Sequence, residues 1–278
     1  MKFHELKDGT VMAYEDMGEG RPVIFIAGWT CNYRDAWGAC MPLVEKGGYR
    51  VVATDQRSVK ETSPSKTRPV ELDMLVDDLR EMIGFLGLED VTLVGSSLGA
   101  YQIFRYIEKY GCDGLHSIVI VDQAPRTIKA FDWDLGMLKG EYTAEMGLEM
   151  YFELKEDFLG RQKKFARKSD EEMEKLSDEE YEKVLLERLE KIRPEEATEL
   201  FYTSIHCDFR YVLPHITVPT GYFYATPGSL YKPELKDYYE KMIPGAVTSV
   251  PFESNDHAFF EKMPEQFSEE LIRFMREH

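Results

Sequence analysis

Short apolar runs alternate with amphipathic stretches along the first 121 residues, and this alternation constrains the fold more than any other feature. The runs are VIFIA (23–27), RVVAT (50–54), VTLV (91–94) and SIVIV (117–121). Apolar residues recur at helical spacing over 72–86 and over 98–110. Continuous apolar runs suit strands buried on both faces, and strands that alternate with helices require right-handed crossovers. We therefore predict an α/β fold with a mostly parallel, doubly wound sheet.

The remainder of the chain divides into a helical part and a return to the sheet. Residues 131–213 contain almost no β-type run, and Leu185, Leu189 and Ile192 lie at i, i+4 and i+7. Strand patterns return at 220–224 and 247–250, followed by an amphipathic helix that carries Phe267 to Met275. At the other end, residues 2–6 and 10–16 flank Asp8-Gly9 and predict a hairpin. We predict a core of 1–130 and 214–278 with a helical cap insertion at 131–213.

Charge and composition restrict the partners. The 278 residues include 34 basic and 51 acidic side chains, a formal net charge of -17. Such a surface repels phosphate backbones and anionic membranes, so we expect a small-molecule substrate and neither nucleic acid nor a membrane. No apolar run approaches the roughly 20 residues of a membrane span, and the first ten residues lack a signal-peptide core. The four cysteines form no zinc-binding pattern, so we expect a cytoplasmic protein with reduced thiols. Whether it forms a homodimer stays open.

One short motif carries chemistry. Gly95-Ser96-Ser97-Leu98-Gly99 follows the G-x-S-x-G pattern and lies between a predicted strand and a predicted helix. A serine nucleophile must sit on a tight, strained turn, where flanking side chains would clash. The helix that follows directs its first N–H groups at a developing oxyanion. Ser97 is therefore the candidate nucleophile, and the N–H of Leu98 is a candidate oxyanion donor.

With these residues the chain resembles the α/β-hydrolase superfamily, and the resemblance covers nearly all of it. The segment DGTVMAYEDMGEGRPVIFIAGW is similar to that family's opening hairpin and third strand. The resemblance implies an α/β-hydrolase fold with a second oxyanion donor after Ala27-Gly28, the N–H of Trp29. Asp55-Gln56-Arg57 resembles the start of a conserved loop of the family, although its usual glycines are replaced here. We interpret Asp55 and Arg57 as structural.

The resemblance also implies a catalytic histidine. The segment SNDHAFF (254–260) follows the last predicted strand, where the family places this residue, so His257 is the candidate general base. The other five histidines are interpreted as structural or solvated: His4, His116, His206, His215 and His278.

The triad acid departs from the family's commonest pattern, which puts an aspartate after the seventh strand. Aligning Pro219-Thr220 with the start of that pattern puts Gly228 in the aspartate position. Asp122 ends the run 117–121, and its D-Q-x-P-R context resembles family members whose acid follows the sixth strand. We predict Asp122 as the acid. Glu234 and Asp256 are the alternatives.

The leading hypothesis for function is a serine hydrolase that cleaves a carboxylic ester, lactone or thioester through an acyl-enzyme. No metal or organic cofactor is implied. Aromatic side chains of the insertion, including Phe131 and Trp133, are predicted to line a mostly apolar acyl pocket, although many of them should pack the insertion onto the sheet.

Other enzymes of the fold stay open. They are cofactor-free oxygenases, perhydrolase-type enzymes and hydroxynitrile lyases, and a slow-turnover ligand sensor is the non-enzymatic alternative. Enzymes with aspartate as the nucleophile are disfavoured by Ser97. A nucleotide-binding module is disfavoured because no phosphate-binding glycine motif follows a strand.

Overall fold

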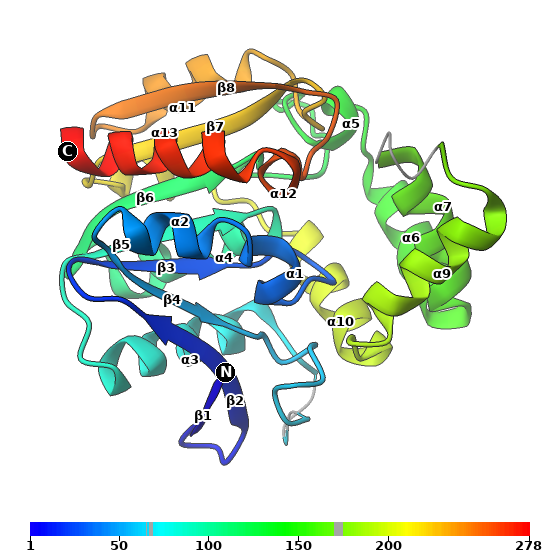
Figure 1. Cartoon of the computed structure of the whole chain (residues 1–278). Helices are drawn as coiled ribbons and strands as arrows, with labels where there is room; N and C mark the ends of the chain where they lie inside the picture. Colours follow the sequence, from blue (N-terminus) through cyan, green and yellow to red (C-terminus); the bar gives the residue numbers. More distant parts are fainter. Residues whose placement is uncertain (65, 67–68, 170–174) are drawn as a thin grey trace.

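An eight-stranded sheet forms the centre of the molecule (Figure 1), as seen in a computed structural model that describes residues 1–64, 66, 69–169 and 175–278. The strand order is β1-β2-β4-β3-β5-β6-β7-β8. Strand β2 runs antiparallel to both of its neighbours, β1 and β4, and the pairs from β4 to β8 are all parallel. The strands are β1 (Lys2–Glu5), β2 (Val11–Met17), β3 (Pro22–Ile26), β4 (Arg50–Thr54), β5 (Val91–Ser96), β6 (Leu115–Val121), β7 (Thr220–Pro227) and β8 (Val247–Ser254).

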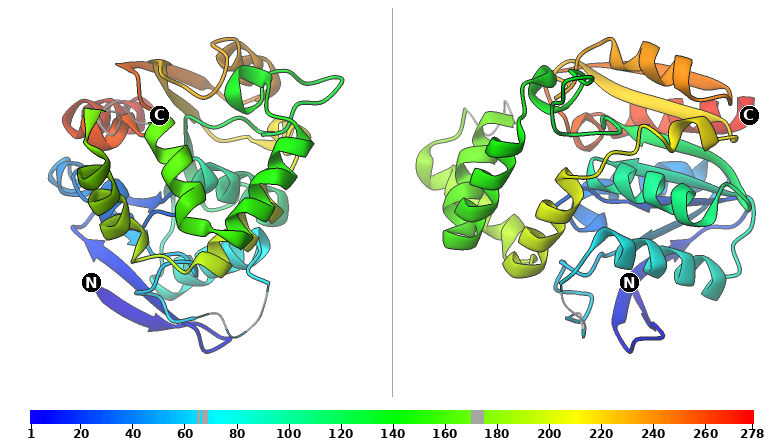
Figure 2. Two further views of the ribbon diagram at one scale, coloured as in Figure 1. Left: turned by 90° about the vertical axis from the view of Figure 1, so that its right-hand side faces the viewer. Right: turned by 180° about the vertical axis from the view of Figure 1, so that it is seen from behind.

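Helices cover both faces of this sheet. One face carries α1 (Tyr33–Trp37), α2 (Met41–Lys46), α12 (Phe259–Lys262) and α13 (Pro264–Glu277). The other carries α3 (Leu72–Phe85), α4 (Leu98–Tyr110) and α11 (Leu235–Met242). Figure 1 shows α2 and α13 in front of the sheet, and the rear view of Figure 2 brings α3 and α4 forward. The predicted doubly wound α/β-hydrolase fold is confirmed.

The continuous apolar runs make this arrangement possible. Successive residues of a strand point to opposite faces, so a run such as Val23-Ile24-Phe25 supplies both cores at once. Val23 and Phe25 pack under α2 and α13, whereas Ile24 packs under α3 and α4. All three side chains are buried. The central strands therefore hold their carboxyl ends at one edge of the sheet, where loops are free to carry a site.

Most of the described part of residues 131–213, called the helical segment below, lies beyond that carboxyl edge (Figure 1). Their described part holds helices and no strand. The helices are α5 (Met137–Gly140), α6 (Ala144–Glu156), α7 (Phe158–Ser169), α9 (Asp178–Leu189) and α10 (Pro194–Ile205), followed by the 3-10 helix η1 (Leu213–His215). Helix α6 packs against both α7 and α10, and α10 also contacts α3.

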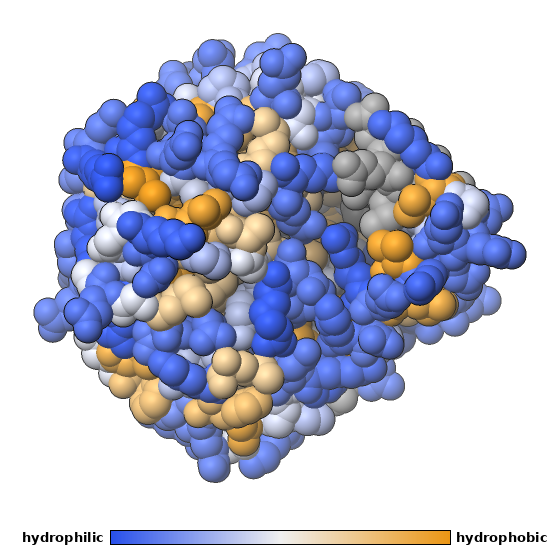
Figure 3. Space-filling view, in the orientation of Figure 1, coloured by the Kyte–Doolittle hydropathy of each residue, from blue (hydrophilic) through white to orange (hydrophobic). Residues whose placement is uncertain are grey.

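Hydrophilic side chains dominate the face of the molecule seen in Figure 3. None of the described helices is both long and apolar enough to cross a membrane.

A buried ion pair fastens the opening hairpin and α3 to the loop after β4. The guanidinium of Arg57 donates two hydrogen bonds of 2.7 Å to the carboxylate of Asp78. It donates a third, also of 2.7 Å, to Asp8 in the hairpin turn. The side chains of Arg57 and Asp78 are only 3% and 6% exposed. Arg57 therefore has the structural position that the sequence suggested.

We predict that Asp78→Ala lowers the free energy of unfolding by about 3–5 kcal/mol, because it leaves a buried guanidinium without its main partner. The matched control is Asp77→Ala on the same helix. Asp77 pairs with Lys109 at 2.5 Å but is half exposed, so its loss should cost less than about 1 kcal/mol. Urea denaturation of both variants measures the difference, and equal losses would contradict the prediction.

Candidate active site

Ser97 lies at the turn between β5 and α4 and has a strained backbone, with φ 51° and ψ −115°. The two glycines of the motif make this turn possible because neighbouring backbone lies too close to them for a side chain to fit. A Cβ atom on Gly95 would lie 2.5 Å from the backbone of Gly99, and one on Gly99 would overlap the carbonyl of Ile26. The sequence thus folds here into the sharp strand-to-helix turn that presents a serine above the sheet.

Two backbone N–H groups stand beside Ser97. One belongs to Leu98, the first residue of α4. The other belongs to Trp29, which follows Gly28. Gly28 lies so close to the serine that a Cβ atom added to it would be 3.4 Å from the Cβ of Ser97. No hydrogen bond within the described parts of the chain uses the N–H of Trp29 or of Leu98. Thr30 has a left-handed φ of 59°, which bends the loop after Trp29. Two unused backbone donors beside a serine are the arrangement that an oxyanion site requires, so Trp29 and Leu98 stay the candidate donors.

A short hydrogen bond joins His257 to Asp122. The distance from Nδ1 of His257 to Oδ2 of Asp122 is 2.6 Å. Asp122 is fully buried and has a positive φ of 44°, whereas the His257 side chain is one-fifth exposed. The N–H of Leu230 also approaches Oδ2, at 3.4 Å. Because Nδ1 is bound to the carboxylate, Nε2 is the ring nitrogen left to accept a proton.

The other two carboxylates considered for the acid lie elsewhere. Oδ1 of Asp256 accepts the N–H of Ala258 at 2.9 Å, and its carboxylate pairs with Lys262 at 2.8 Å. Glu234 sits at the start of α11. Among these candidates, the structure brings only Asp122 to the imidazole.

Position 228, where the resemblance would put an aspartate, has no room for a side chain. A Cβ atom on Gly228 would overlap the backbone of Asn255 and Asp256, the residues that lead into His257. Any larger residue at this position would push the histidine loop away. The loop after β7 is instead tied down by Lys139, whose ammonium donates to the carbonyls of Pro227 and Tyr231 at 3.3 and 2.9 Å. Burial lowers the pKa of Lys139, against the opposing influence of the Asp122 carboxylate.

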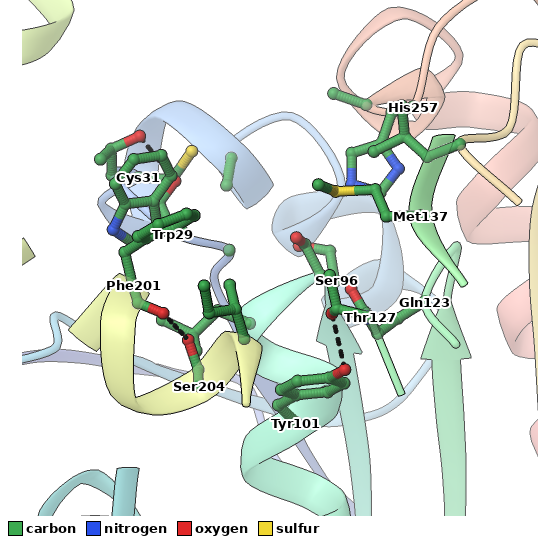
Figure 4. Close-up of a pocket in the computed structure, with 18 of the residues that line it drawn as sticks. Trp29, Cys31, Ser96, Tyr101, Gln123, Thr127, Met137, Phe201, Ser204 and His257 are labelled. Atoms are coloured by element: carbon green, nitrogen blue, oxygen red, sulfur yellow. Dashed lines mark hydrogen bonds between the residues drawn. The ribbon is translucent and has the colours of Figure 1, made fainter. Parts of the chain in front are cut away.

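Ser97 and His257 line one cavity of about 210 Å³ between the sheet edge and the helical segment. In Figure 4, Trp29, Cys31 and Phe201 lie on one side of it and His257 and Met137 on the other. The helical segment contributes mainly apolar side chains: Met137, Met150, Leu185, Leu189, Phe201 and Ile205. The walls are therefore mostly apolar, with the reactive groups at the end formed by the sheet.

Two predicted pocket residues do not line this cavity, so that prediction is wrong. Phe131 is fully exposed to solvent. Trp133 is buried, but its ring packs against Tyr238 and its Nε1 donates to the carbonyl of Arg126 at 3.1 Å. Both precede α5 in the chain. The cavity is lined instead by helices further along the segment, and aromatic residue type alone could not distinguish the two groups.

The cavity wall also holds charged and polar side chains. Arg188 of α9 and Glu261 of α12 form an ion pair of 3.1 Å across the boundary between the helical segment and the sheet domain. Burial raises the pKa of the Cys31 thiol to about 12, which keeps it protonated and unreactive. Within the described ranges, no three His, Cys, Asp or Glu side chains are grouped so as to hold a metal ion.

The family model of the alpha/beta hydrolase fold matches residues 21–262, and the chain belongs to this family. Among solved structures, an esterase from Exiguobacterium antarcticum superposes with a TM-score of 0.84 at 22% identity, covering 99% of this chain and 98% of the other. At this identity the likeness concerns the fold.

Relatives of known name match a shorter region. A non-heme chloroperoxidase of Kitasatospora aureofaciens is 38% identical over 119 residues, 43% of this chain and 42% of the relative. A bifunctional esterase/perhydrolase of Acinetobacter calcoaceticus is 32% identical over 127 residues, 45% of each chain. The chain thus spans less than half the length of these relatives.

We predict that Asp122→Asn keeps the fold and lowers kcat by about 10³- to 10⁴-fold, because the amide favours the wrong imidazole tautomer. Asp256→Asn is the control. The Asp256 carboxylate binds Ala258 and Lys262 and not the imidazole, so this variant should keep most of the wild-type kcat. Steady-state ester hydrolysis and circular dichroism measure both variants. A near-normal rate for Asp122→Asn together with a large loss for Glu234→Gln would move the acid to the loop after β7.

Proposed function

We propose that this protein is a serine hydrolase that cleaves a small, mostly apolar carboxylic ester or lactone through an acyl-enzyme. The observation that carries the proposal is the Asp122–His257 hydrogen bond at the cavity that Ser97 also lines. Membership of the hydrolase family and the esterase names among its relatives support the same reaction type.

The geometry suggests the order of events. Nε2 of His257 takes the proton of the Ser97 hydroxyl as the oxygen attacks the carbonyl carbon. The carbonyl oxygen becomes an oxyanion next to the N–H groups of Trp29 and Leu98. The imidazolium, stabilised by the Asp122 carboxylate, then protonates the departing alcohol. Water repeats the attack on the acyl-enzyme and releases the acid.

Cavity size and lining support the substrate class. A volume of about 210 Å³ lies below the roughly 300–1,000 Å³ of common ligand pockets, so the enclosed part of the substrate must be small. The side chains of Met137, Met150 and Phe201 offer dispersion contacts and few hydrogen bonds. Short acyl chains or small lactone rings fit this chemistry better than charged groups.

We predict that Ser97→Ala abolishes labelling by a fluorophosphonate and lowers ester turnover by about 10⁴- to 10⁶-fold. Ser96→Ala is the matched control, because it removes the neighbouring hydroxyl and should keep the label on Ser97. Mass spectrometry of the labelled peptide and a panel of p-nitrophenyl esters and lactones give the result. Labelling that survives Ser97→Ala but not Ser96→Ala would reject the nucleophile, and one slow turnover with a persistent adduct would indicate a ligand sensor.

A second candidate is perhydrolysis, favoured by the similarity to a protein named as an esterase/perhydrolase. In this reaction hydrogen peroxide replaces water as the acceptor of the acyl group and a peracid is released. The same acyl-enzyme serves both reactions, so wild type and Ser97→Ala should be compared with a short carboxylic acid or ester and peroxide. Peracid formed by wild type alone would support this activity, and none above background would exclude it.

A further inference from the structure

Gln56 holds the backbone next to the oxyanion donors without touching the cavity. Its Nε2 donates a hydrogen bond of 3.0 Å to the carbonyl of Gly28. Its own Oε1 accepts a hydrogen bond of 3.4 Å from Nε2 of Gln102 on α4. Both amide side chains are more than nine-tenths buried, and neither lines the cavity. Two buried side-chain amides, joined by hydrogen bonds, therefore connect α4 to the loop after β3.

The Gly28 carbonyl determines where the next N–H points. The peptide bond between Gly28 and Trp29 is trans, since the one cis peptide among the described residues precedes Pro227. In a trans peptide the C=O and the following N–H point in opposite directions within one rigid plane. A hydrogen bond that fixes the carbonyl of Gly28 on the buried side therefore turns the N–H of Trp29 to the opposite side. That N–H has no partner in the described protein.

The loop requires such fastening because it is strained. Thr30 adopts a left-handed φ of 59°, which is unfavourable for a residue with a side chain and persists only where neighbours enforce it. Asp55, one residue before Gln56, accepts the N–H of Tyr33 at 2.9 Å and holds the other end of the loop. The Asp55-Gln56 pair thus clamps residues 28–33 at both ends.

We propose that Gln56, oriented by Gln102, is a positioning residue that aims the N–H of Trp29 at the oxyanion. The inference rests on the proposed serine-hydrolase function and assigns to Gln56 a share in its rate. Gln56 acts through the Gly28–Trp29 peptide, so its contribution concerns the transition state and not the binding of the substrate in its ground state.

The test compares wild type with Gln56→Leu, which removes the donor and nearly preserves the volume. We expect kcat for a p-nitrophenyl ester to fall about 10- to 100-fold, since deleting one oxyanion donor outright costs about 10²- to 10³-fold and a misaimed donor costs less. KM should stay unchanged. A trifluoromethyl ketone, which forms an oxyanion on Ser97, should bind more weakly by the same factor as kcat falls. The matching methyl ketone should bind as it does to wild type.

Two further variants separate positioning from stability. Gln102→Leu leaves the bond to Gly28 but frees the Gln56 amide to rotate, so it should show a smaller loss of the same kind, even if Gln56→Leu does not fold. Thr92→Val removes the buried hydrogen bond of 3.0 Å between Thr92 and Ser117, one strand from the loop, and should leave kcat and both affinities unchanged.

The outcomes distinguish this inference from the proposed function. Wild type that hydrolyses esters and is labelled at Ser97, while Gln56→Leu and Gln102→Leu keep the wild-type kcat, overturns the inference alone. So does a weaker affinity for both ketones alike, which would indicate general damage to the pocket. Wild type that is inactive and unlabelled overturns the proposed function and this inference with it.

Discussion

The hydrogen bond between Asp122 and His257 is the interaction on which the site depends, and it crosses the sheet. Asp122 follows β6 and His257 follows β8, so the bond must pass over the end of β7, which lies between them. Gly228 at that end has no side chain, and the backbone before His257 rests directly against it. The glycine at the end of β7 and the carboxylate at the end of β6 are therefore two parts of one packing arrangement.

Much of this arrangement could be predicted from the sequence because it depends on local patterns. The apolar runs that became β3 to β6 fill two cores at once, and few other folds accommodate them. The predicted order of the strands also places the G-x-S-x-G motif after one strand and His257 after the last one. The roles of Ser97, His257 and Asp122 stay predictions, although the structure places the last two in contact.

The rest could not be predicted, because it depends on how distant segments pack. Phe131 and Trp133 have aromatic side chains of the kind that often line pockets. Phe131 nevertheless faces solvent, and Trp133 packs beside Tyr238. The left-handed backbone of Thr30 and Asp122 has no sequence signature, since glycine is the usual marker of a positive φ. Both residues adjoin the site, as strained non-glycine residues often do.

Trp29 links the two halves of the molecule. Its backbone N–H lies beside Ser97, while its indole Nε1 donates a hydrogen bond of 2.7 Å to the carbonyl of Ala197 on α10 and its ring packs on Phe201. One residue is therefore shared between the part that shapes the cavity and the part that would meet the reacting oxygen. A substitution in α10 that widens the cavity would also remove contacts that hold Trp29, so under the proposed function a change in substrate range would alter the turnover rate as well.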